Sequence, residues 1–137
     1  MFDTFAKNTL VPLILRAGLA VIFVFHGLGK VNAETEWGWS WHPGGQDAMA
    51  GPLQMAVAWG ELVGGIALGL GLLTRLAALC IAAIMAGAIV TVHGEHGFAL
   101  PMGFEYNFAI LVLCAAVIIG GPGKLAMDSV FFRKRST

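Results

Sequence analysis

The sequence predicts an all-α integral membrane protein built as a four-helix bundle, and two observations predict it. Four apolar stretches approach membrane-spanning length, at about residues 10–29, 53–73, 76–92 and 104–119. A bilayer core of about 30 Å requires roughly 20 helical residues. The composition agrees, since 58% of the 137 residues are apolar and 12% are charged, with a mean hydropathy of +0.80. Four spans leave room for short connections alone, so residues 1–137 are expected to form a single domain.

The first stretch is expected to remain as a span, because it is longer than the roughly 7–15 residues of a signal-peptide core and contains Arg16 and His26. The second and third spans are expected to form an antiparallel hairpin, since the link at 73–76 is very tight. The second span also carries small-xxx-small pairs that allow close helix contact. These pairs are Gly60/Gly64 and Gly65/Gly69.

The basic residues predict the orientation. Six Lys and Arg residues lie at the N-terminus, in the second connection and at the C-terminus, against Lys30 alone on the opposite side. The positive-inside rule then places both termini in the cytoplasm. After the fourth span, Gly120-Gly121-Pro122-Gly123 must break the helix. Residues 125–132 are then expected to form a short interfacial helix, followed by a basic cluster at 133–135 that touches anionic headgroups.

The connection between the first two spans is the longest and carries Trp37, Trp39 and Trp41 at alternate positions. We interpret them as an interfacial aromatic belt, with a lid over a cavity mouth as the alternative.

Cys80 and Cys114 both lie within spans, where cysteine usually behaves as a small hydrophobe, so no disulfide is expected. The net charge of zero gives no indication of a nucleic-acid partner.

Each apolar stretch carries an ionisable side chain inside it or at its rim. Charged groups near the hydrocarbon cost roughly 2.5–3.5 kcal/mol each on insertion scales, so they normally face a bundle interior and a partner. At about 1.5 Å per helical residue, one such group from each span falls in the outer half of the bundle. These groups are His26, Glu61, His93 and Glu105. We therefore expect them to enclose one polar cavity that opens toward the periplasmic face.

Three interpretations of this cluster stay open, and the first is a structural charge network that fixes the register of the helices. In it, Glu61 pairs with Arg16 or Lys30, because an unpaired carboxylate at that depth would be too costly. His26 would then pair with Glu105. The full expected network is Arg16, Lys30, Glu61 and Arg75.

The second interpretation is a quinone or proton site, to which histidine is suited because imidazole titrates near neutral pH. The third is a zinc or iron site formed by the same cluster, His26, Glu61, His93 and Glu105, with His96 as a further ligand. The chain lacks the Glu-x-x-His pairs of di-iron bundles, which favours a quinone over a metal.

Five groups of motif residues run in order along nearly the whole chain. They are Leu15-Arg16 with Phe25-His26-Gly27-Leu28-Gly29-Lys30, Gly60-Glu61-Leu62-Val63-Gly64-Gly65, Gly71-Leu72-Leu73-Thr74-Arg75-Leu76-Ala77, Val92-His93, and Gly121-Pro122-Gly123-Lys124 with Asp128. Together they resemble the DoxX family of small bacterial membrane proteins. The triple-Trp loop departs from that resemblance, since it is longer and more aromatic than expected of the family.

The resemblance implies a four-helix inner-membrane protein linked to redox systems. Relatives are named for a subunit of a terminal quinol oxidase, for thiosulfate:quinone oxidoreductase and for a membrane-associated oxidoreductase complex. The expected function is therefore a subunit or anchor of a quinone-linked system, with other redox subunits and the lipid bilayer as partners. A stand-alone conduit for protons or small solutes, or a metal-binding oxidoreductase, is the alternative. The residues that match the family pattern are Arg16, His26, Lys30, Glu61, Thr74, Arg75 and His93.

Overall fold

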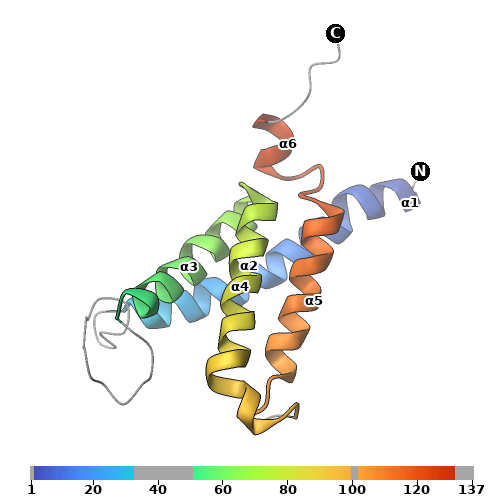
Figure 1. Cartoon of the computed structure of the whole chain (residues 1–137). Coiled ribbons are helices and arrows are strands. Elements are labelled where there is room, and N and C mark those ends of the chain that lie inside the picture. The colour runs from blue at the N-terminus through green and yellow to red at the C-terminus, as the bar shows by residue number, and fades with distance from the viewer. Residues whose placement is uncertain (1, 33–50, 100–101, 132–137) are drawn as a thin grey trace.

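The computed structural model describes residues 2–32, 51–99 and 102–131, which are helical apart from short connections (Figure 1). The chain begins with α1 (Phe2–Phe5), a π-helical turn (Ala6–Leu10) and α2 (Val11–Val31). Together they contain one continuous apolar helix of 29 residues, Asp3–Val31. The predicted first span, 10–29, is the central part of this helix. Its N-terminal extension escaped prediction because Asp3, Lys7 and Asn8 interrupt the apolar run without breaking the helix.

The remaining helices follow the predicted order. α3 is Gly51–Leu70, and α4 (Thr74–Ala88) continues through a π-helical turn (Ile89–His93) and a short 3₁₀ turn (Gly94–His96). α5 (Glu105–Gly120) is an apolar helix of 16 residues, and α6 (Met127–Phe131) follows it. The described chain thus has three helices long and apolar enough to cross a membrane, together with the shorter α5. The all-helical prediction is confirmed.

The bundle consists of two helix pairs that meet at one end. α2 packs along α3 and α4 packs along α5, while the contact between α3 and α4 joins the two pairs. In Figure 1, α3 and α4 come together at the turn 71–73 and separate away from it. We call the end that holds residues 71–73 the turn end. The opposite end, where α3 begins and the continuation of α4 ends at His96, is called the cavity end after the cavity described below. The tight hairpin predicted for the second and third spans is therefore present, with α3 ending at Leu70 rather than at residue 73.

Glycines let the α2–α3 pair approach closely. A Cβ atom on Gly27 would lie 2.5 Å from the backbone nitrogen of Leu62, and one on Gly65 would lie 2.8 Å from that of Val24. The pair Gly60/Gly64 instead faces α4, where added Cβ atoms would lie 3.0 Å from Ile84 and 3.2 Å from Ile81. The glycine pairs on α3 therefore serve two different helix interfaces, which is how small residues act in membrane proteins.

Pro12 explains a contact between the two ends of the chain. Proline has no N–H, so it cannot donate to the carbonyl four residues earlier, which belongs to Asn8. The Asn8 carbonyl accepts a hydrogen bond from the backbone N–H of Lys124 at 3.0 Å. The segment after α5 is thereby attached to the beginning of α2, at the turn end.

Residues 71–73 form a strained turn that a distant carboxylate stabilises. Gly71 has φ +70°, and Leu73 has φ +46°, a left-handed conformation that is costly for a residue with a branched side chain. The Asp128 carboxylate accepts the backbone N–H groups of Leu73 at 2.7 Å and Thr74 at 2.8 Å. These donors lie at the start of α4 and have no partner within the helix, so Asp128 acts as its N-terminal cap from another part of the chain.

Arg16 binds the same end of the bundle from α2. Arg16 is 1% exposed, and its guanidinium donates to the carbonyls of Leu68 at 3.0 Å, Gly69 at 3.3 Å and Leu125 at 3.0 Å. The first two carbonyls lie in the last turn of α3, where a cation also complements the helix dipole. Arg16 was one of the two basic partners expected for Glu61, but it binds these backbone carbonyls instead.

Candidate functional site

A partly buried ion pair joins α2 to α3 beside the cavity. The Lys30 ammonium lies 2.6 Å from each oxygen of the Glu61 carboxylate, whose side chain is 3% exposed. Gly27 lies one turn before Lys30 and Gly65 lies one turn after Glu61, so the close helix approach at these glycines brings the two charges together. Lys30, the second expected partner of Glu61, makes the pair.

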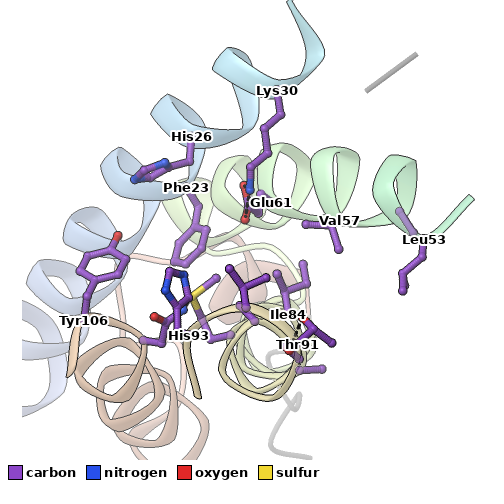
Figure 2. Close-up of a pocket in the computed structure, with 17 residues that line it drawn as sticks. Phe23, His26, Lys30, Leu53, Val57, Glu61, Ile84, Thr91, His93 and Tyr106 are labelled. Carbon is purple, nitrogen blue, oxygen red and sulfur yellow. Dashed lines mark hydrogen bonds and ion pairs between the residues drawn. The ribbon is translucent and has the colours of Figure 1, made fainter. Parts of the chain in front are cut away.

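A cavity of about 490 Å³ lies beside this pair, between the two helix pairs (Figure 2). Figure 2 shows Lys30 and Glu61 on one side of it and His93, Ile84 and Thr91 on the other. Most of its wall is apolar. The polar side chains that line it are His26, Lys30, Glu61, Thr91, His93, Tyr106 and Asn107.

His93 makes a hydrogen bond to the segment that follows the α4 continuation. It ends the π-helical turn of α4, and its Nδ1 lies 3.0 Å from the carbonyl oxygen of Met102. A carbonyl can only accept, so Nδ1 is the donor in this contact, and Nε2 is an acceptor whenever it carries no proton. His93 lines the same cavity as His26 and Glu61, two of the residues with which it was predicted to form a cluster.

His26 lies at the edge of the cavity, between α2 and α5. Its ring stacks edge-to-face with Phe25 at a centroid distance of 5.9 Å and lies 6.4 Å from the Tyr106 ring. His26 and Tyr106 are both partly open to the molecular surface, and Figure 2 shows them together on the same side of the cavity. The pairing of His26 with Glu105 considered above has no counterpart among the interactions of the described residues; His26 contacts aromatic rings instead.

Glu105 is not among the residues that line the cavity. It is the first residue of α5, and its backbone N–H donates to the Phe98 carbonyl at 2.8 Å. The next two residues, Tyr106 and Asn107, line the wall in its place. Asn107 is 4% exposed and donates from Nδ2 to the Met85 sulfur at 3.5 Å. A shift of one residue at a helix start rotates the side chain by about 100°, which spacing along the sequence does not determine.

Other candidate residues lie elsewhere. Arg75 is exposed at the turn end, where a Cβ on Gly121 would lie 3.3 Å from its Nη2. His96 lies 3.6 Å from Glu95 and outside the cavity wall. Among the residues that the structure describes, no three His, Cys, Asp or Glu side chains are grouped so as to hold a metal ion. The Trp37, Trp39 and Trp41 belt falls outside the described residues.

Three comparisons relate the chain to known proteins. The family model DoxX matches residues 11–94. An uncharacterized protein of Haemophilus influenzae is 33% identical over 124 residues, covering 88% of this chain and 90% of that protein. A Bacillus subtilis protein named "Putative oxidoreductase CatD" is 30% identical over 122 residues, covering 88% and 87%. No solved structure matches. The family match and both relatives span most of the helical bundle, and the chain therefore belongs to the DoxX family.

Proposed function

We propose that this protein is a membrane subunit or anchor of a quinone-linked redox system, and that the cavity beside Lys30 and Glu61 binds the quinone ring. The observation that carries this proposal is a mostly apolar cavity with hydrogen-bonding groups of both kinds in its wall. Such a combination is typical of sites for small apolar ligands with a few polar atoms. The name of the Bacillus subtilis relative, an oxidoreductase, also supports a redox role.

The polar groups of the cavity suit both redox forms of a quinone. The carbonyls of the oxidised ring accept hydrogen bonds, and Lys30, Tyr106 and Asn107 carry donors. The hydroxyls of the reduced ring donate, and the Glu61 carboxylate and Nε2 of His93 are acceptors. The same wall therefore offers a partner to the ring oxygens in either state.

Replacing His93 by alanine should weaken quinone binding about five- to tenfold, since one hydrogen bond contributes about 1 kcal/mol or slightly more. The measurement is titration calorimetry of the purified protein in detergent with decylubiquinone. His96→Ala is the matched control, because His96 lies three residues further on and outside the cavity wall. It should bind within twofold of the wild type. No binding by the wild type, or equal losses in the two variants, would contradict the proposed site.

We also propose that both termini are cytoplasmic, so that the cavity end faces the periplasm of a bacterial inner membrane. The support is the excess of Lys and Arg at the turn end and the termini. A membrane-impermeant maleimide should label Glu95→Cys in spheroplasts and Lys7→Cys only after lysis. Both side chains are well exposed, at 81% and 71%. Both changes are made in a Cys80→Ala, Cys114→Ala background. The reverse labelling pattern would overturn the orientation.

A further inference from the structure

The interface between α3 and α4 changes from closed to open along its length. Toward the turn end the helices touch, because Cβ atoms on Gly60 and Gly64 would lie within 3.2 Å of Ile84 and Ile81. One turn further along α4, a Cβ on Gly87 would meet no atom of the described residues within 4 Å. Gly87 nevertheless lines the cavity, so the cavity reaches the molecular surface at this point.

Small residues frame this opening on both helices. Ala56 of α3 and Ala83 and Gly87 of α4 all line the cavity and are all exposed. We call these three residues the small-residue slot. Leu53, which lines the cavity one turn before Ala56, is 53% exposed and continues the apolar surface. Among the described residues, the three that frame the opening are small and uncharged, so an alkyl chain can enter between them without moving the helices.

The depth of the slot along α4 indicates that it faces hydrocarbon rather than water. Gly87 lies thirteen residues from the first residue of α4, Thr74, which is about 20 Å along a helix axis. The helix that contains them, Thr74–His96, is apolar over 23 residues. In a bilayer core of about 30 Å, this position lies inside the hydrocarbon. A group that enters here comes from the lipid phase.

The opposite side of the cavity differs chemically. Between α2 and α5 it is edged by His26 and Tyr106, whose rings lie 6.4 Å apart and carry polar atoms. The Lys30–Glu61 pair lies between the two sides, as Figure 2 shows, with Leu53 and Val57 beyond it. The cavity is therefore polar at one side and apolar at the other, which suits a ligand with a polar ring and a hydrocarbon tail.

We infer that the cavity takes its ligand sideways from the bilayer, and that the ligand is a quinone whose hydrocarbon tail lies in the small-residue slot between α3 and α4. This inference rests on the proposed function for the identity of the ring. What the slot adds to the proposed function is that the ligand enters from the bilayer and must carry a hydrocarbon tail. A ligand bound this way leaves its tail among the lipids while its ring reaches the buried charges.

The test compares Gly87→Leu, which fills the slot, with Gly18→Leu, which adds the same side chain at another exposed and unobstructed position. Leucine has a higher helix propensity than glycine, so neither change is expected to weaken its helix. Binding of decylubiquinone and of its tailless parent ring is measured by calorimetry for each variant. Gly87→Leu should weaken decylubiquinone binding at least about tenfold and leave the tailless ring within about twofold. Gly18→Leu should change neither.

The outcomes separate the two proposals. Equal losses for the tailed and tailless rings in Gly87→Leu, or no loss for either, would overturn the lateral slot while the ring site stands. A wild-type protein that binds neither compound would overturn the ring site and the slot together. Ala83→Leu, on the same helix and lining the same slot, should repeat the selective loss, and it replaces Gly87→Leu if that variant does not fold. Thermal unfolding of each variant verifies that the binding data come from folded protein.

Discussion

Replacing Arg16 by methionine should destabilise the folded protein by about 3–5 kcal/mol. Three carbonyls would lose a charged donor at once, two at the end of α3 and that of Leu125. Methionine keeps much of the length and none of the hydrogen bonds. The measurement is equilibrium unfolding by SDS in mixed micelles.

Two further variants show whether the loss comes from those contacts. Arg16→Lys keeps the charge, but one ammonium lacks the planar fork that reaches carbonyls on two chain segments, so its loss should be intermediate. Lys7→Met removes a basic residue whose pair with Asp3 is exposed, at 3.0 Å, and should cost at most about 1 kcal/mol. If Arg16→Met were as stable as Lys7→Met, the assigned role of Arg16 would be wrong.

The second large effect is expected at the Lys30–Glu61 pair. Removing one partner of a buried pair typically costs about 3–5 kcal/mol, whereas replacing both by apolar residues is often nearly neutral. Glu61→Leu and Lys30→Met should therefore each destabilise more than the double variant. Lys30→Met should be the worse of the two, because it leaves the Glu61 carboxylate, which is 3% exposed, without its cation. The Lys30 side chain is 30% exposed, and its long stem can carry the ammonium toward water.

A double-mutant cycle measures the coupling directly. The same SDS unfolding assay applied to the two single variants and the double variant should give a coupling of about 3 kcal/mol. The exposed pair of Lys7 and Asp3 provides the matched comparison, with an expected coupling below about 1 kcal/mol. Additive losses for Lys30 and Glu61 would mean that the two groups do not interact in the membrane.

Much of the bundle could be predicted because hydropathy and glycine spacing are local properties. The apolar stretches locate the helices, and Gly60, Gly64, Gly65 and Gly69 indicate the faces that pack. The depth of Glu61 in its span and its charge were enough to limit its expected partner to Arg16 or Lys30. Choosing between them required the structure, because Gly27 determines where α2 approaches α3, and its contact with Leu62 has no signature in the periodicity.

The rest depended on helix register and on distant contacts. The π-helical turn at Ile89–His93 changes the direction of the side chains along it. The side of the helix on which His93 lies could therefore not be predicted by counting residues along α4. Because α5 begins at Glu105, the side chains of Tyr106 and Asn107 line the cavity. The sequence did not predict these two residues as part of the site. Asp128 was noted for its resemblance to the family pattern, but the hydrogen bonds that it makes to Leu73 and Thr74 follow only from the folded chain.

The attachment of the C-terminal segment to the turn end has a consequence for synthesis. The Leu125 carbonyl, the Asp128 carboxylate and the Lys124 N–H all bind groups that belong to the first long helix or to the start of α4. A ribosome delivers those helices to the membrane before it has made residues 124–128. The nascent protein therefore carries an uncapped α4 and an incompletely bound Arg16 until the last part of the chain emerges. Assembly of this end is a late event, and a chain truncated after α5 would be inserted without completing it.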